Sequence, residues 1–189
     1  VTIAMAVGVA RMAKHNAIIR KLPAVETLGS TTVICSDKTG TLTRNQMTVT
    51  RLFDARQIFE LSGTGYEPLG NLTSSGAPVT LDQQPELELL VRIGLLCNES
   101  DLYEKDGHYQ VDGDHTEGAL LVSALKSGLL LEQEKERFPQ LAMVPFESER
   151  GYMATLHQDG ARRLILVKGA PERVLEMCSA SPQQSEQAL

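Results

Sequence analysis

The stretch YMATLHQDGARRLILVKG, residues 152–169, decides the fold class of this chain. Residues 152–157 and 163–167 are rich in apolar and strand-forming side chains, and the pair Asp159-Gly160 stands between them. An Asp-Gly pair between two such runs is typical of a tight turn, because both positions can adopt positive φ angles. We therefore predict an antiparallel hairpin here, followed by a short helix that begins at Pro171.

Two longer helices are predicted upstream of this hairpin. Pro85 opens the segment PELELLVRIGLLC, whose apolar residues fall on one helical face: Leu87, Leu90, Val91 and Leu95. Thr116 is a natural N-cap for a second helix that runs through GALLVSALKSGLL. We expect the charged run EQEKER, residues 132–137, to be a solvated helix end with i,i+4 pairs.

Strands and a loop are predicted before these helices. Residues 47–53 and 57–61 are strand-like, whereas residues 70–84 are rich in Ser, Thr, Gly, Pro and Asn and are expected to form a loop. Helices interspersed with antiparallel strands define an α+β domain, an antiparallel sheet flanked by helices, over residues 46–189.

The N-terminal part has a different character. Residues 1–16 predict a helix, and TTVICS, residues 31–36, is apolar enough to be a buried strand. Asp37 follows directly, at the strand end where catalytic groups gather in α/β sheets. This part is expected to be an incomplete α/β segment, because a single strand cannot make a sheet.

Composition restricts the classes of function. The 189 residues carry 24 acidic and 18 basic side chains, a net charge of -6, which argues against a nucleic-acid surface. The three cysteines lack metal-ligand spacing and fit a reducing cytosol. The apolar run VTIAMAVGVA is too short to span a bilayer, but basic residues follow it. It is either the cytoplasmic flank of a membrane helix or an ordinary core helix.

The string Asp37-Lys38-Thr39-Gly40-Thr41 carries the strongest chemical signal. Phosphoryl transfer to a carboxylate needs a nucleophile in line with the phosphate, together with cations and donors around the phosphate oxygens. Asp37 can supply the nucleophile and Lys38 a positive charge, while the hydroxyls of Thr39 and Thr41 are candidate donors. The structural alternative is an N-capped turn between a strand and a helix. No GxxxxGK[ST] loop is present.

The segment ICSDKTGTLTRNQMTV, residues 34–49, resembles the phosphorylation signature of the P-type ATPases, which belong to the haloacid dehalogenase-like superfamily. Further blocks resemble that family in the same order: KLPAVETLGS, GTGYEPLG, GDHTEGAL, PFESER and KGAPE. They are most similar to the type II subclass, which includes calcium and sodium/potassium pumps. The phosphatases of the superfamily carry a second aspartate where this chain has Thr39. A phosphatase fragment is therefore the weaker alternative.

The resemblance implies a division into three parts. Residues 1–29 would be a stalk helix and linker after a membrane helix, and residues 30–45 the first segment of the phosphorylation domain. Residues 46–189 would be a C-terminally truncated nucleotide-binding domain. The implied partners are ATP, the missing phosphorylation, actuator and membrane domains, and a cation bound elsewhere. The whole protein would be a multi-pass membrane protein, with this fragment on the cytoplasmic side.

The resemblance also implies the site residues. Asp37 would accept the phosphoryl group, and Mg²⁺ would bind its carboxylate and the Thr39 carbonyl. The ATP pocket would contain the following residues: Thr116, Glu117, Phe146, Arg150, Met153, Lys168 and Gly169. From the residues alone, Phe146 is either a stacking platform for adenine or a core side chain. Glu117 either complements the helix dipole or, by resemblance, binds the adenine amino group.

One departure from the family concerns nucleotide affinity. Many type II pumps have a lysine after the arginine that corresponds to Arg150, whereas this chain has Gly151. The family further completes its phosphorylation site with later motifs, including GDGxND, that do not occur in this sequence. We therefore expect the chain to bind nucleotide without turnover, whereas the intact pump would couple ATP hydrolysis to cation transport through an aspartyl phosphate.

Overall fold

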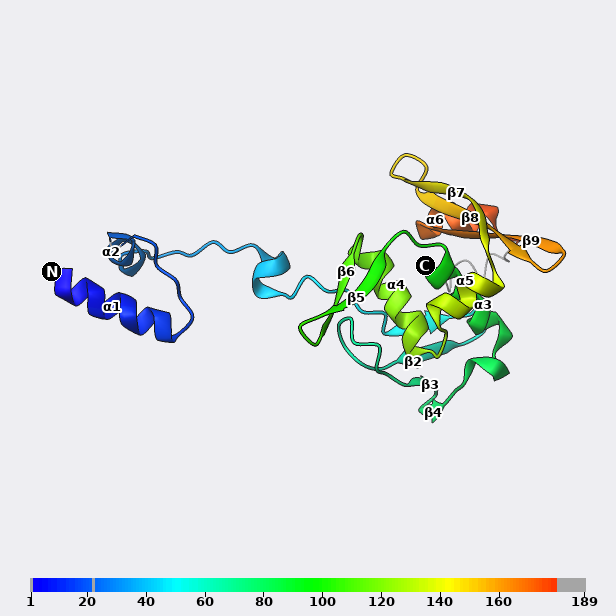
Figure 1. Ribbon diagram of the computed structural model, residues 1–189, viewed down its shortest axis with the longest axis horizontal. Coiled ribbons are helices and arrows are strands. Elements are labelled where there is room, and N and C mark those ends of the chain that lie inside the picture. Colours follow the sequence, from blue (N-terminus) through cyan, green and yellow to red (C-terminus); the bar gives the residue numbers. More distant parts are fainter. Residues whose placement is uncertain (1, 22, 180–189) are drawn as a thin grey trace. The chain divides into compact units, whose positions relative to one another are not determined.

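A computed structural model describes residues 2–21 and 23–179, which belong to two compact units (Figure 1). The N-terminal unit comprises residues 1–44 and the C-terminal unit residues 45–189. No described helix is both long enough and apolar enough to cross a membrane.

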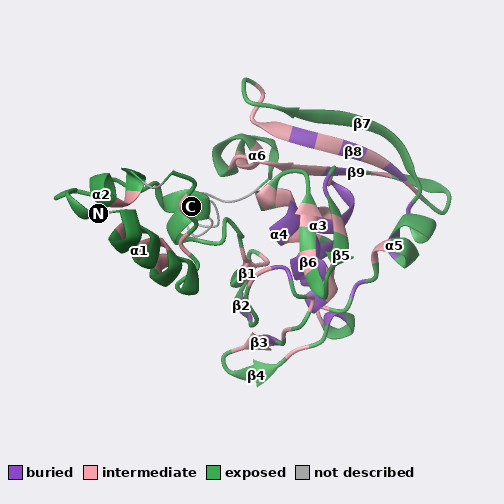
Figure 2. Ribbon diagram, turned by 60° about the vertical axis from the view of Figure 1, so that its left-hand side comes forward, coloured by how far each residue is buried: buried purple, intermediate pink, exposed green. Residues whose placement is uncertain are grey.

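The N-terminal unit contains little regular structure. Helices α1 (Thr2–Lys14) and α2 (Pro23–Gly29) contact each other, and the first confirms the helix predicted at residues 1–16. A single turn, η1 (Lys38–Leu42), follows; Thr39 and Gly40 have non-helical backbone angles, and the Thr43 N–H donates to the Lys38 carbonyl over 3.1 Å. None of the described residues in this unit is buried, and its ribbon in Figure 2 is green and pink.

The structure differs from the prediction at residues 31–36, where no strand forms. Val33 and Ile34 are 74% and 78% exposed. A strand obtains its backbone hydrogen bonds and its apolar cover from neighbours, and the described residues of this unit supply no second strand. The apolar, β-branched composition therefore does not produce a strand by itself.

The C-terminal unit begins with a four-stranded antiparallel sheet in the order β1-β2-β3-β4. Strands β1 (Arg51–Phe53) and β2 (Ile58–Leu61) lie within the stretches predicted as strands. The prediction of a loop at residues 70–84 is wrong in part, because β3 (Leu72–Ser74), β4 (Ala77–Pro78) and the 3₁₀ turn η2 (Leu81–Gln83) lie there. Ser75 and Gly76 both have positive φ, which closes the β3–β4 hairpin.

A second hairpin pairs β5 (Asp101–Lys105) with β6 (His108–Asp112). Asp106 and Gly107 form its turn with φ angles of 54° and 75°. This is the same Asp-Gly signal that predicts the hairpin at residues 152–169, but the mostly polar strands around it hide the pattern. Helix α4 (His115–Lys126) contacts both strands.

The third sheet has the order β7-β8-β9 and confirms the predicted hairpin. Strands β8 (Tyr152–Asp159) and β9 (Arg162–Gly169) are paired from Tyr152–Gly169 to Asp159–Arg162. The edge strand β7 (Gln140–Glu147) was not predicted; all eight of its residues are exposed, so it lacks the alternation of buried and exposed residues that marks a strand.

The helices of this unit cover the sheets and bury the core (Figure 2). Helix α3 (Pro85–Leu96) confirms the helix predicted from Pro85; it buries Leu87, Val91 and Leu95 against α4 and the first sheet. Complete burial of one such side chain contributes about 1.5 to 3 kcal/mol. The end of α3 packs on the third sheet through Leu96 and Cys97. Helix α6 (Pro171–Met177) confirms the helix predicted after the hairpin and contacts β9.

The prediction of a solvated helix end at residues 132–137 is confirmed for most of these residues, which are exposed, but it is wrong for Glu134. Helix α5 (Leu131–Arg137) buries Glu134, whose Oε2 lies 2.5 Å from the Nε of Arg92 on α3. Arg92 also pairs with Glu88, and both carboxylates raise the pKa of Arg92 although burial by itself would lower it. The buried cation on α3 therefore fixes α5, a partner that the i,i+4 pattern does not reveal.

Candidate functional site

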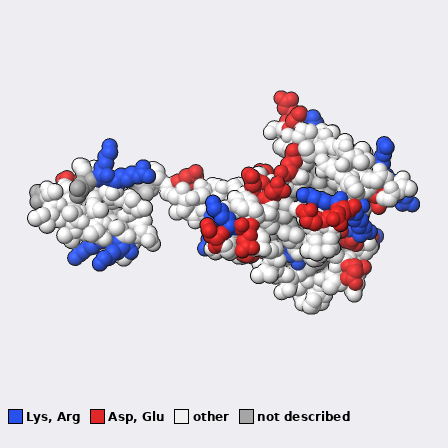
Figure 3. All heavy atoms as spheres, viewed as in Figure 1, with Lys and Arg blue, Asp and Glu red and all other residues white. Residues whose placement is uncertain are grey.

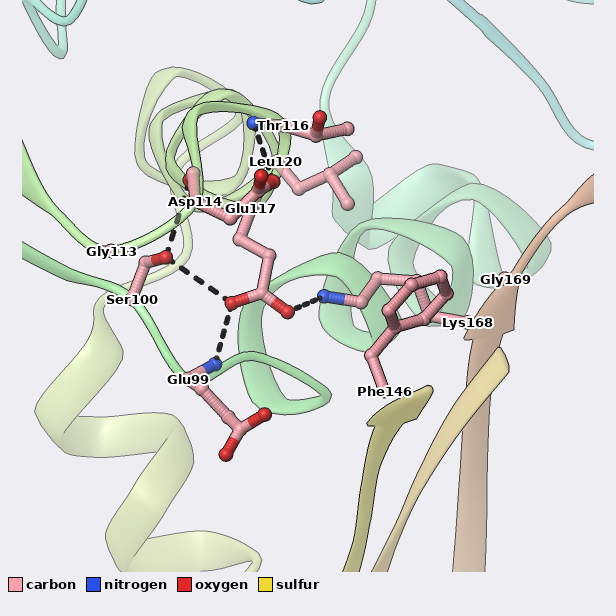
Figure 4. A pocket seen from close by; sticks show the side chains of 10 residues that line it. All are labelled: Glu99, Ser100, Gly113, Asp114, Thr116, Glu117, Leu120, Phe146, Lys168 and Gly169. Atoms are coloured by element: carbon pink, nitrogen blue, oxygen red, sulfur yellow. Dashed lines mark hydrogen bonds and ion pairs between the residues drawn. The ribbon is translucent and has the colours of Figure 1, made fainter. Parts of the chain in front are cut away.

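A cavity of about 560 Å³ lies between the start of α4, the turn after α3 and the ends of β7 and β9 (Figure 4). Its size is in the range of small-molecule sites. It is lined by Glu99, Ser100, Gly113, Asp114, Thr116, Glu117, Leu120, Phe146, Lys168 and Gly169. Four chain segments thus meet around one space.

Helix α4 presents Glu117 to this cavity from its first turn. The N-cap is Asp114 and not the predicted Thr116: the Asp114 carboxylate accepts hydrogen bonds from the Thr116 and Glu117 N–H groups over 2.8 and 3.1 Å. These bonds, above all that from Glu117, hold the pKa of Asp114 below its ordinary value. The cap fixes the start of the helix and therefore the position of Glu117.

Lys168 reaches Glu117 from the end of β9. Its Nζ lies 2.5 Å from the Glu117 Oε1, and the two side chains are only 17% and 13% exposed. The next residue must be glycine, because a Cβ on Gly169 would lie 2.4 Å from the Gly151 carbonyl oxygen. The backbone at the end of β9 can approach the start of β8 this closely only without a side chain.

Phe146 contributes an exposed aromatic ring from β7. The residue is 52% exposed and lines the cavity, so the interpretation as a core phenylalanine is wrong. Figure 4 labels its ring among the side chains that line the cavity. An exposed ring at the wall of a cavity is a surface on which a planar ligand can stack.

The other predicted pocket residues do not line the cavity. Met153 is fully buried in the core between α3 and the third sheet. Arg150 donates to the Pro145 carbonyl and to Glu147, both over 3.0 Å. Gly151 has φ +75°, and a Cβ there would lie 3.0 Å from Arg173 Cγ. A lysine at this position would therefore be strained in this backbone.

Glu99 and Ser100 are among the cavity residues that were not predicted from the sequence, as are Gly113, Asp114 and Leu120. The Glu117 Oε2 accepts from the Glu99 N–H over 3.0 Å and from the Ser100 hydroxyl over 3.2 Å. A backbone N–H has no sequence signature, and 17 residues separate Ser100 from Glu117. Only the position of a polar turn immediately after an apolar helix could have indicated them.

The residues predicted to be catalytic lie in the N-terminal unit. Asp37, Lys38, Thr39 and Thr41 are all exposed and occupy the turn at residues 37–42. No group of three or more His, Cys, Asp or Glu side chains within the described ranges is arranged to hold a metal ion. Mg²⁺ needs few protein ligands, since it keeps several waters and binds substrate phosphates. Asp37 and the Thr39 carbonyl fit that type of site.

The C-terminal unit, with helices on antiparallel sheets, has the α+β fold expected of the cytoplasmic domain of a cation pump, and the comparison with protein families agrees. The profile of the P-type ATPase cytoplasmic domain N matches residues 86–189. The chain belongs to the P-type cation-transporting ATPases. This result favours the pump family over the phosphatase alternative.

Curated relatives match nearly the whole chain. A probable cation-transporting ATPase F of Mycobacterium tuberculosis is 50% identical over 179 residues, which is 94% of this chain and 20% of that protein. The cation-transporting ATPase pma1 of Synechocystis is 49% identical over 95% of the chain and 20% of its own length. A calcium-transporting ATPase of Bacillus subtilis is 42% identical over the same shares. The chain thus spans about a fifth of the length of these relatives.

Proposed function

We propose that this chain binds ATP in the cavity of the C-terminal unit, as the nucleotide-binding part of a cation pump. One observation carries the proposal: the fold brings Glu117, Phe146 and Lys168, which come from three separate elements, to the same 560 Å³ cavity. The adenine ring would stack on Phe146, and its amino group would donate to the Glu117 carboxylate. Thr116 and Gly169 would complete the wall.

Lys168 supplies the positive charge of this site. ATP is an anion and the chain has a net charge of -6, so the overall field does not attract it and a local cation must. The ammonium is paired with Glu117 in the structure. ATP would give Lys168 a second anionic partner, and the Glu117 Oε1, which has two lone pairs, would also accept from the amino group of the base.

The wider activity is proposed on the same basis. Asp37 would accept the γ-phosphoryl group of ATP with Lys38 and Thr41 beside it, and Mg²⁺, held by Asp37 and the Thr39 carbonyl, would neutralise phosphate charge. Residues 1–29 would be stalk and linker, residues 30–45 would start the phosphorylation domain, and residues 46–189 would bind the nucleotide. The aspartyl phosphate would drive cation transport by membrane and actuator domains beyond this chain.

Titration of ATP against the purified chain by calorimetry tests the pocket. Phe146→Ala should weaken binding by roughly tenfold, because base stacking on an aromatic ring contributes about 1 to 3 kcal/mol. Lys168→Ala should weaken it by a similar factor through the lost cation. Tyr103→Ala is the matched control, since Tyr103 is an exposed aromatic residue on β5 outside the cavity.

The pocket assignment is wrong if neither Phe146→Ala nor Lys168→Ala weakens binding, or if Tyr103→Ala weakens it equally. Far-UV circular dichroism of each variant confirms that the fold is retained. Lys168→Ala needs this check most, because it leaves the partly buried Glu117 without its ion-pair partner.

A further inference from the structure

The two oxygens of the Glu117 carboxylate have different surroundings (Figure 4). Oε1 faces Lys168, whose Nζ lies 2.5 Å away. Oε2 faces the turn after α3, where it accepts from the Glu99 N–H over 3.0 Å and the Ser100 hydroxyl over 3.2 Å. The turn therefore holds one oxygen, and the other contacts Lys168 at the wall of the cavity.

The turn itself is firmly built. Ser100 is only 5% exposed, and its N–H donates to the Asn98 Oδ1 over 2.9 Å. The Asn98 amide donates to the carbonyls of Gly94 and Glu117 over 3.0 and 2.9 Å, which joins the end of α3 to the start of α4. A Cβ on Gly113 would lie 2.4 Å from the Ser100 Oγ, so a glycine at that position makes room for the hydroxyl.

The Ser100 hydroxyl has one proton and two acceptors at the same distance. Both the Asp114 carbonyl and the Glu117 Oε2 lie 3.2 Å from its Oγ. A hydrogen bond to a carboxylate is stronger than one to a neutral carbonyl, so the proton favours Glu117. Without this hydroxyl, Oε2 would keep only the Glu99 N–H, so the orientation of the carboxylate would be less firmly fixed on the side of the turn, although Oε1 would still contact Lys168.

We propose that Ser100 is a positioning residue for base recognition, which acts by holding Oε2 of Glu117 so that Oε1 accepts from the exocyclic amino group of adenine. The inference rests on the proposed function of the cavity. An ionised carboxylate only accepts hydrogen bonds. A purine with a carbonyl oxygen in place of the amino group would place that oxygen next to the Glu117 Oε1, and neither of these acceptors can donate a hydrogen bond. A site that leaves polar groups unpaired in this way binds such a ligand more weakly.

Binding of ATP and ITP tests this proposal, because the two nucleotides differ only around position 6 of the base. The unaltered chain should bind ATP more tightly than ITP. Ser100→Ala should lower the ratio of ATP affinity to ITP affinity by about fivefold, which is the effect of one hydrogen bond. The change should come mainly from weaker binding of ATP. Glu117→Gln should remove most of the preference, since an amide can donate as well as accept.

The double variant Ser100→Ala, Glu117→Gln separates positioning from general support of the fold. If Ser100 acts through the carboxylate, Ser100→Ala has no further effect on the ATP/ITP ratio in the Glu117→Gln background. Ser123→Ala is the matched control: Ser123 is a buried serine of α4 whose hydroxyl donates to the Leu120 carbonyl, and its loss should leave the ratio unchanged. Ser100→Cys, with a weaker donor, should give an intermediate ratio and serves if Ser100→Ala does not fold.

Two results would overturn the role of Ser100 alone. One is that Ser100→Ala weakens the binding of ATP and of ITP equally, and the other is that Ser100→Ala changes the ATP/ITP affinity ratio further in the Glu117→Gln background. Failure of the unaltered chain to bind either nucleotide would instead overturn the proposed function, and the Ser100 proposal with it. The two failures are therefore distinguishable in one set of titrations.

Discussion

Lys126, in the last turn of α4, is buried, and no described residue forms an ion pair with it. The residue is 8% exposed, and its Nζ has no hydrogen-bond partner among the described residues. It lies against two glycines: a Cβ on Gly63 would be 3.1 Å from Nζ, and one on Gly70 would be 3.2 Å from Cδ. Burial lowers the pKa of the ammonium, whereas the helix C-terminus offers it some compensation.

Replacement of Lys126 by methionine should therefore maintain or raise stability. Met retains the aliphatic stem and removes the buried charge, so we expect a gain of up to about 1 kcal/mol at pH 7 in urea unfolding. Because the folded pKa lies below the unfolded value of 10.5, the native chain binds fewer protons than the unfolded chain between these two values.

The stability of the unaltered chain relative to Lys126→Met should therefore rise as pH rises through the folded pKa toward 10.5. Urea unfolding of both chains at pH 7 and pH 10 measures this difference. All other titrating groups are the same in the two chains, so their effect on stability cancels in the comparison. A loss of more than about 1 kcal/mol at pH 7 would show instead that the ammonium makes a stabilising contact.

At the scale of elements, the cap of α4 links stability to the site. Asp114→Ala should lower stability by about 1 kcal/mol at pH 7, because the N–H groups of Thr116 and Glu117 lose their acceptor. Asp114→Asn should retain most of the stability that the cap contributes, because asparagine can also cap a helix. A folded pKa below the unfolded one means that the contribution of the carboxylate is complete above the unfolded pKa and disappears as pH falls through the folded pKa.

Thermal unfolding of the unaltered chain and Asp114→Ala at pH 7 and below pH 4 measures this cap. The difference between the two should shrink on acidification. Equal stability at pH 7, or a difference that persists unchanged in acid, would contradict the assignment of Asp114 as the cap.

Elements with local signals could be predicted from the sequence, and those that depend on distant partners could not. Pro85, Pro171 and Gly160 mark their helices and hairpin because φ restriction and turn chemistry act within a few residues, although the turn lies at residues 160–161 and Asp159 still pairs with Arg162 in the sheet. Residues 31–36 have strand-like composition, but a strand also requires a neighbour. The charged sequence around Glu134 predicts a surface residue, because its buried partner Arg92 lies 42 positions earlier in the chain.

The candidate site likewise contains residues that local sequence blocks indicated and residues that depend on distant contacts. Glu117, Phe146, Lys168 and Gly169 lie in short blocks that resemble those of a family, so the blocks indicated them, and the structure brings them together. Ser100 acts through a hydroxyl contact across 17 residues, and the position of Met153 in the core depends on how β8 packs. Neither contact leaves a pattern in the sequence.

At the scale of the whole molecule, the two units differ in physical character. The C-terminal unit contains two apolar cores, whereas no described residue before position 45 is buried. Acidic and basic side chains are interspersed over the face of the C-terminal unit shown in Figure 3, with no broad surface of one sign. The proposed nucleotide site and the proposed phosphoryl acceptor Asp37 therefore belong to two units with very different degrees of packing.

This difference predicts that the chain binds ATP without becoming phosphorylated. Transfer to Asp37 needs an in-line γ-phosphate and donors in a site that excludes water, where electrostatic stabilisation is strong. Asp37 and its neighbours Lys38, Thr39 and Thr41 are instead exposed.

Incubation with γ-labelled ATP and Mg²⁺, followed by an acid quench, should therefore give no more label than Asp37→Asn, although calorimetry shows ATP bound to both. Acid-stable, hydroxylamine-sensitive label on the unaltered chain and not on Asp37→Asn would contradict this prediction. It would show that residues 1–189 assemble a working acceptor site around the exposed Asp37 carboxylate.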